Sequence, residues 1–204
     1  MPKTHEPVIR ECGEPLVDLK KACPGLVLRL DGGKRAYVRR QVARMLKRAL
    51  RSLPKGMTFV IRDAWRSPDE QEGIFHGFVR RFGRQHPAWS GARVRNEAKK
   101  FVADARGKFA SGHMTGGALD LRLIKHGRRV PMRSRRLSYA ENAHPHHKKL
   151  PAYLLKNRQI MYQAMSKAGF SQCHNEFWHW SYGDIYWAMR TGRKTAIYGV
   201  VEKL

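Results

Sequence analysis

The chain has 204 residues, of which 42% are hydrophobic and five are tryptophan, so it can bury a core and is not a disordered basic tail. Its 41 Lys and Arg residues against 16 Asp and Glu give a formal charge of +25, which favours contact with a polyanion: nucleic acid, an anionic cell-wall polymer or an acidic membrane face. No run is long and apolar enough for a membrane span, and residues 1–15 lack the apolar stretch of a signal peptide. We therefore expect a cytoplasmic protein, or a periplasmic or cell-wall protein if a leader has been removed.

The first half of the chain alternates strand-like and helical patterns. The predicted elements are a strand at 25–30 (GLVLRL), a helix at 37–50 with an apolar stripe, a buried strand at 57–65 (MTFVIRDAW), a helix from Pro68 to Gly83 and a helix around 96–106 (NEAKKFVADAR). The pair Ser67-Pro68 is typical of a helix start.

The second half continues the mixture. Its predicted elements are a strand at 117–124 (GALDLRLI), a basic loop at 125–150, a helix at 151–168, an aromatic strand-like segment at 173–182 (CHNEFWHWSY) and a short last helix (DIYWAMRTG). Strands and helices follow one another without a regular βαβ period, which indicates the α+β class. We expect a single domain over 1–204, with its core at about 15–190, in which helices pack on a small antiparallel sheet.

The cysteines do not form a recognisable framework. Cys12, Cys23 and Cys173 are too few and too scattered for a set of disulfides, and no CxxC pair is present for a thiolate metal site. We therefore expect three free thiols.

The segment SGHMTGGALDL (111–121) places a histidine and an aspartate on either side of a glycine pair. The glycines allow the backbone to fold so that His113, from a loop, and Asp120, from a strand, converge. An imidazole nitrogen and a carboxylate oxygen are both ordinary zinc ligands. The alternative is a loop that simply enters a strand.

The segment NEFWHW (175–180) contains Glu176 and His179 between bulky aromatic residues. A catalytic zinc needs three protein ligands and a nearby carboxylate that can accept a proton from water, and His179 and Glu176 would complete such a set with the residues of the first segment. Residues i and i+3 of a strand point to opposite faces, so a bulge or a strand end must bring the two together. The alternative is an aromatic core strand with an exposed glutamate.

A third segment, RDAWRS (62–67), places Arg66 directly after a buried strand. Hydrolysis of an amide needs positive charge where the oxyanion forms, and Arg66 is suitably placed for that. In a chain this rich in arginine, the alternative is a solvated charge.

The ordered set DAWRS, SGHMTGGALDL and EFWHW resembles the D-alanyl-D-alanine dipeptidase family, which belongs to a zinc peptidase group that also contains D,D-carboxypeptidases. The middle block matches the family pattern at Ser111, His113, Gly116, Ala118, Asp120 and Leu121. The segment VDLKKACPGLVLRL (17–30) is similar to the opening strand of the family, so the resemblance spans roughly 15–182.

The resemblance implies a role for each site residue. His113, Asp120 and His179 would bind Zn²⁺, which the sheet would carry. Glu176 would be the catalytic base and proton shuttle, and Arg66 would stabilise the transition state. Ser111 would hold the amino end of the substrate.

The chain also departs from the family pattern. Trp65 and Ser67 replace the usual tyrosine and proline beside the arginine. An Asn-Asn-Phe-x-Gly segment that helps to wall the substrate pocket is missing where DGGKRAYVRRQ (31–41) stands, which puts strict dipeptide specificity in doubt. The histidines of HPHH (144–147) are expected in an exposed loop, and Cys173 and His174 are expected to pack at the rim of the site.

The expected function is zinc-dependent hydrolysis of the D-alanyl-D-alanine peptide bond by a metal-bound water, with the glutamate as base. One alternative is a peptidoglycan D,D-carboxypeptidase or endopeptidase of the same zinc group. Another, from a different class, is a basic nucleic-acid-binding protein with a vestigial site. The expected partners are a small D-amino-acid dipeptide or a peptidoglycan stem peptide, with contact to an anionic polymer through the basic surface.

Overall fold

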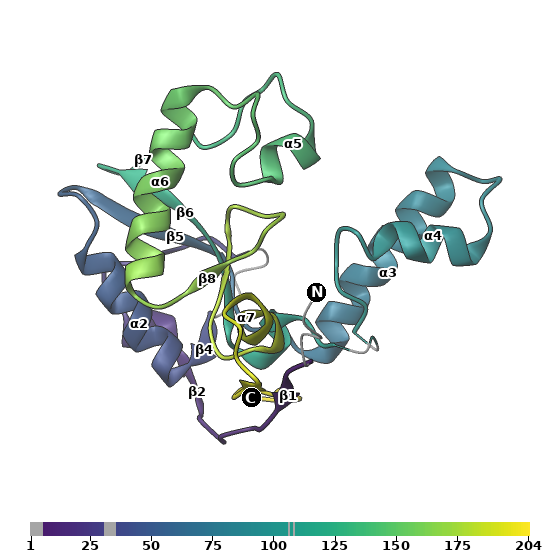
Figure 1. Cartoon of the computed structure of the whole chain (residues 1–204), viewed down its shortest axis with the longest axis horizontal. Coiled ribbons are helices and arrows are strands. Elements are labelled where there is room, and N and C mark those ends of the chain that lie inside the picture. The colour runs from purple at the N-terminus through teal and green to yellow at the C-terminus, as the bar shows by residue number, and fades with distance from the viewer. Residues whose placement is uncertain (1–5, 31–35, 106, 108) are drawn as a thin grey trace.

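The computed structural model describes residues 6–30, 36–105, 107 and 109–204 (Figure 1). Its helices are α1 (Leu19–Ala22), α2 (Arg40–Arg51), α3 (Pro68–Gln85), α4 (Gly91–Ala98), the 3₁₀ helix Gly112–Thr115, α5 (Tyr139–Ala143), α6 (Ala152–Lys167) and α7 (Ile185–Arg190). Its strands are β1 (Val8–Ile9), β2 (Leu16–Asp18), β3 (Val27–Leu28), β4 (Tyr37–Arg39), β5 (Met57–Asp63), β6 (Ala118–Lys125), β7 (Arg128–Arg129), β8 (Ser171–Gln172), β9 (His179–Ser181) and β10 (Thr195–Ala196). Within the described ranges, the helices are all too short or too polar to cross a membrane.

The central sheet has the strand order β3-β5-β6-β9-β8, with β7 paired to β6. All of its pairs are antiparallel except β3 with β5. A parallel pair needs a crossover, and the segment between these two strands contains α2, which supplies it. The expected α+β class with a small sheet is confirmed, with this one parallel edge as the difference.

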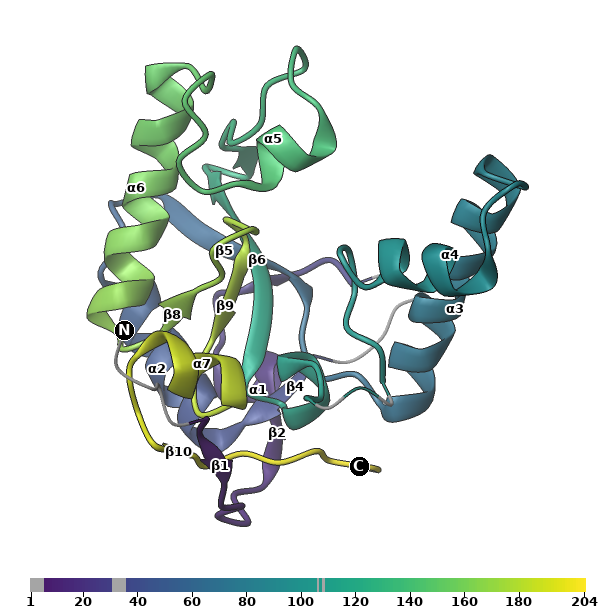
Figure 2. The same cartoon turned by 45° about the vertical axis from the view of Figure 1, so that its right-hand side comes forward.

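The sheet has two unlike faces. On β6, Leu119, Leu121 and Leu123 alternate onto one face and are fully buried against α2 and α6 in the main core. Asp120 and Arg122 alternate onto the other face. Figures 1 and 2 show α2 and α6 on one side of the sheet and the α3–α4 pair on the other side. This second face is partly open to solvent, since Arg62 is exposed and Arg122 is half-buried.

Helices α3 and α4 form an arm with an apolar cluster of its own, built from Phe75, Phe82, Val94 and Ala98. The helix start expected at Ser67-Pro68 is confirmed: the Ser67 side chain accepts from the backbone N–H of Glu70, and the Glu70 side chain accepts from that of Ser67. The sequence alone misplaces the second helix of the arm.

Several element boundaries differ from those expected. The helix predicted at 96–106 ends at Ala98 and begins at Gly91, where the Ser90 side chain caps it; residue 106 lies outside the described residues. Residues Tyr37–Arg39 form β4 instead of the first turn of a helix, because they pair with β2. The predicted basic loop at 125–150 contains β7 and α5. The place where the family's pocket segment is expected, residues 31–41, includes 31–35, which lie outside the described residues.

Candidate active site

The three predicted metal ligands come from three neighbouring elements. His113 lies in the 3₁₀ helix, Asp120 in β6, and His179 is the first residue of β9. Asp120 and His179 are direct partners in the β6–β9 ladder, so the sheet register places them side by side. Gly116 ends the 3₁₀ helix with a φ of 70°, in the left-handed region that favours glycine, and turns the chain into β6.

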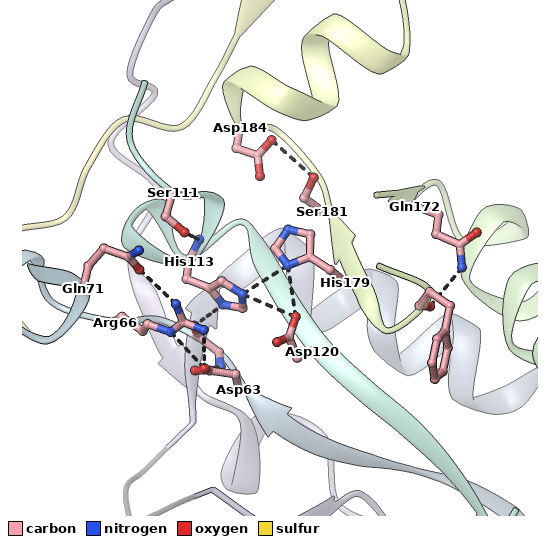
Figure 3. Close-up of polar contacts among 12 residues, drawn as sticks. Asp63, Arg66, Gln71, Ser111, His113, Asp120, Gln172, His179, Ser181 and Asp184 are labelled. Carbon is pink, nitrogen blue, oxygen red and sulfur yellow. Dashed lines mark hydrogen bonds and ion pairs between the residues drawn. The ribbon is translucent and has the colours of Figure 1, made fainter. Parts of the chain in front are cut away.

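The ligand atoms of these residues converge on one point (Figure 3). His113 Nε2 lies 3.2 Å from His179 Nδ1 and 3.4 Å from Asp120 Oδ1, and His179 Nδ1 lies 3.0 Å from Asp120 Oδ1. Bond lengths of 2.0–2.1 Å in a tetrahedron put neighbouring zinc ligands about 3.4 Å apart. The donor set therefore fits a zinc ion, and in the described part of the chain no other group of acidic, histidine or cysteine side chains does so.

The tautomer of His113 is set by the backbone. Its Nδ1–H donates to the carbonyl oxygen of Ala64 at 2.7 Å, which leaves the Nε2 lone pair to face the other ligands. Burial alone would raise the pKa of Asp120, but the charges and hydrogen bonds of His113 and His179 hold it well below its usual range. Asp120 is therefore a carboxylate, as a metal ligand must be.

Arg66 is held beside the ligands by two side chains. Its Nε and Nη2 donate to Asp63 Oδ2 at 2.8 and 2.5 Å, and its Nη1 donates to Gln71 Oε1 at 2.9 Å. Gln71 is fully buried and is fixed in turn by a bond from its Nε2 to the carbonyl oxygen of Ala103. Arg66 is thus a positioned charge and not a solvated one.

Glu176 lies in the loop that precedes β9, and its carbonyl oxygen accepts from the backbone N–H of His179. The observed strand, β9, is therefore shorter than the strand expected at 173–182. Because Glu176 precedes the strand and His179 begins it, both residues can line the same cavity, as expected for a strand end. That cavity, of about 310 Å³, is lined by all three ligand residues and by Arg66. Burial raises the pKa of Glu176 above its usual value, although the charge of His179 opposes the shift.

Ser111 also lines this cavity and is almost fully buried. Its hydroxyl accepts from the backbone N–H of His113 at 3.3 Å, so it caps the 3₁₀ helix that carries the first ligand. Contact between Ser111 and substrate stays a prediction. Cys173 lines the cavity as well, and all three cysteines are free, as expected.

Aromatic side chains form the two walls of the cavity. Phe78 and Phe101 come from the arm and its following turn, and Tyr139 and Trp178 come from the opposite side. The rings of Phe101 and Tyr139 approach to 6.4 Å between centroids, and Tyr139 meets Trp178 at 5.8 Å. Phe78, Phe101 and Tyr139 lie outside the three motifs, and Trp178 lies inside NEFWHW, where no local pattern marks it as a wall of the cavity.

The histidines of the 144–147 loop lie apart from this cavity. His144 and His146 are exposed, and His147 is partly exposed. They belong to no group that could hold a metal among the residues described, in agreement with the expected surface loop.

Three clustered donors, an adjacent half-buried carboxylate and a fixed arginine are what a mononuclear metallohydrolase requires. A family model described as D-ala-D-ala dipeptidase matches residues 17–193, so the chain belongs to the D-Ala-D-Ala dipeptidase family, a family of zinc metallopeptidases. A search of curated protein sequences finds no significant match.

Several solved structures align with this chain at low sequence identity. The LdcB LD-carboxypeptidase aligns over 90% of this chain and 74% of its own, with 19% identity and a TM-score of 0.54, which is a likeness of fold. The vancomycin-resistance D,D-pentapeptidase VanY, in complex with Zn(II), aligns over 78% of this chain and 80% of its own, with 14% identity and a TM-score of 0.48. The D,D-dipeptidase VanXYg aligns over 77% of this chain and 56% of its own, with 20% identity and a TM-score of 0.46.

Proposed function

We propose that the chain hydrolyses the peptide bond of D-alanyl-D-alanine, with His113, Asp120 and His179 as zinc ligands and Glu176 as the base. The observation that carries this proposal is the convergence of three ligand atoms within 3.4 Å of one another beside a half-buried carboxylate. Membership of the D-Ala-D-Ala dipeptidase family supports the choice of substrate.

Zinc held by these residues would supply Lewis-acid activation of water and of the scissile carbonyl. Glu176 takes a proton from the attacking water as the new C–O bond forms, and it passes that proton to the amine when the C–N bond breaks. A carboxyl group with a raised pKa suits both halves of this task, because it must accept and then release one proton.

Arg66 stabilises the negative charge that develops on the carbonyl oxygen. Its guanidinium is held by Asp63 and Gln71 before substrate arrives, so little reorganisation accompanies the reaction. Ser111 lines the same cavity and would receive the amino end of the substrate.

The same machinery would serve a peptidoglycan D,D-carboxypeptidase or endopeptidase. One observation favours this second candidate: the face of β6 that carries Asp120 continues into a further cavity at Arg122. A free dipeptide would occupy only the cavity that contains the three donors, whereas a stem peptide would extend along β6 into the further cavity.

A nucleic-acid-binding protein with a vestigial site is less well supported. A vestigial site would have lost ligands or their alignment, but here the three donors and the arginine are aligned by backbone and side-chain hydrogen bonds.

The test is D-alanine release from D-alanyl-D-alanine by zinc-loaded protein, with and without a chelator. Release that the chelator abolishes supports the dipeptidase assignment. If the protein holds zinc and releases no D-alanine from the dipeptide, but does so from a pentapeptide that ends in D-Ala-D-Ala, the carboxypeptidase is the function. Failure on both substrates would overturn the proposal.

A further inference from the structure

A second cavity, of about 360 Å³, lies on the open face of the sheet and is lined by five arginines. They come from the segment after β3, from β5, β6 and β7, and from the loop that follows β7: Arg29, Arg62, Arg122, Arg129 and Arg133. The other residues that line the cavity are apolar, and none is acidic. Such a lining attracts an anion and offers many N–H donors to it.

The arginines of this cavity repel one another. Burial, followed by the charges of Arg133, Arg62 and Arg129, lowers the pKa of Arg122 to about 10. Among the described residues, no carboxylate forms an ion pair with Arg122, Arg129 or Arg133. Repulsion between like charges that are partly buried destabilises the fold. An anionic ligand bound between the arginines would neutralise this repulsion.

Arg133 lies at the boundary between this cavity and the active site. Its guanidinium stacks over the ring of Trp178, 4.4 Å from the centroid, and Trp178 lines the cavity of the metal ligands. The Nε–H of Arg133 is buried and has no hydrogen-bond acceptor within the described structure. The stack holds the arginine at the wall that the two cavities share.

The spacing between the two cavities is set by β6. Asp120 lines the first cavity and Arg122 the second, and both side chains project from the same face of the strand. Residues i and i+2 of a strand are about 7 Å apart, which is also the length of two residues of an extended peptide.

We propose that the arginine cavity is a subsite for a peptide carboxylate, so that the preferred substrate is an extended peptide with a free carboxylate about two residues from the scissile bond. This inference rests on the proposed function and names its substrate class. A guanidinium group can donate two parallel hydrogen bonds to one carboxylate. The cavity has room for one or two carboxylate groups. A nucleic acid would need a long surface to follow its backbone, whereas this lining is confined to a single hollow.

The test uses two synthetic pentapeptides that end in D-Ala-D-Ala and differ only by glutamate or glutamine at the second residue before the scissile bond. The zinc-loaded protein should cleave the glutamate peptide with a kcat/KM at least about tenfold higher, because a hydrogen bond between charged groups discriminates by this much. In Arg122→Gln and Arg129→Gln the ratio between the two peptides should fall to about one. Arg128→Gln is the matched control, since Arg128 is exposed on β7 and does not line the cavity.

Binding of the same peptides to Glu176→Gln, measured by calorimetry, separates this inference from the proposed function. A preference for the glutamate peptide that Arg122→Gln removes supports the subsite, even if no peptide is cleaved. Cleavage of both peptides at equal rates, with equal binding, overturns it. A thymidine octanucleotide serves as the competitor. If it removes the preference for the glutamate peptide in Glu176→Gln, and if it no longer binds once Arg122→Gln is added, the inference is overturned in favour of a phosphate polyanion.

Discussion

Asp63 and Asp120 lie opposite each other in the β5–β6 pair, and each aligns a different part of the site. Asp120 contributes a carboxylate oxygen to the cluster of three donors, while Asp63 holds Arg66 by two hydrogen bonds. The register of the two strands shifts between Ile61 and Asp63, so a bulge at the end of β5 turns Asp63 toward the site. One strand pair therefore positions both the positive charge of Arg66 and the carboxylate of Asp120.

Removal of one ligand should remove the metal. In His179→Ala, zinc content measured by mass spectrometry should fall from about one equivalent to near zero, because two remaining donors bind zinc far more weakly than three. The melting temperature should fall with it, since a ligand that binds only the folded state stabilises that state. His146→Ala, an exposed histidine of the 144–147 loop, should keep both values. Full zinc retention in His179→Ala would contradict the assignment.

Loss of the base should separate metal binding from turnover. Glu176→Gln preserves the shape of the side chain but cannot accept a proton, so kcat should fall by a factor of about 10²–10⁴. Zinc content and melting temperature should stay at the values of the unmodified protein, because Glu176 is not one of the three clustered donors. Steady-state release of D-alanine together with metal analysis decides the matter, and retained turnover would show that another group takes the proton.

Asp63→Asn should lower kcat while zinc binding is kept. The neutral amide leaves Arg66 with only Gln71 as a firm partner, so the guanidinium would no longer be fixed before the reaction. We expect a loss of about 10- to 100-fold in kcat and a smaller change in KM, as is typical when transition-state stabilisation is weakened. Asp69→Asn, an exposed residue in the first turn of α3, is the control. Equal effects of the two variants would contradict a positioning role.

Gly112→Ala should disrupt the site without touching a ligand. A Cβ atom on Gly112 would lie 2.2 Å from Asp184 Oδ2 and 3.0 Å from Ala118 Cβ, and Asp184 is fully buried. The 3₁₀ helix would have to shift, and His113 with it, so zinc content and melting temperature should both fall. Gly77→Ala in α3 has open space at the same atom and should be neutral or stabilising by up to about 1 kcal/mol. Thermal unfolding of the two variants compares them directly.

Arg158 should be a major determinant of stability. It is buried in α6, its guanidinium lies 3.9 Å from the centre of the Phe177 ring, and its donors reach the carbonyl oxygens of the 132–145 segment. Those oxygens belong to Met132, Asn142, His144 and Pro145.

Arg158→Leu would leave these acceptors buried and unpaired, so we expect a loss of at least about 3 kcal/mol in the free energy of unfolding. Arg48→Leu removes a single hydrogen bond at the surface of α2 and should lose about 1 kcal/mol or less. Denaturant unfolding measures both values, and similar losses would contradict the role of Arg158.

The strands that carry the site could be predicted from the sequence because their signal is local. Leu119, Leu121 and Leu123 alternate in β6, and the apolar run of β5 is bounded by turn residues. The clustering of His113, Asp120 and His179 could be predicted because these residues fall in two motifs of the family pattern.

Other features depend on pairing between distant segments. Tyr37–Arg39 looks helical on its own and becomes β4 only because Leu16–Asp18 lies beside it. The role of Asp63 follows from a bulge that no local pattern announces. The arginine cavity is also invisible in the sequence, because with 41 Lys and Arg residues the spacing of any five carries little information.

The three proposed ligands are far apart along the chain: Asp120 and His179 are separated by 59 residues, and His113 and His179 by 66. One ion bound to all three closes a long loop, which contains β7, α5 and α6. Metal binding and folding are then thermodynamically coupled. A substitution that weakens the packing of α6 on the sheet, far from any reacting atom, would therefore lower the affinity for the metal ion.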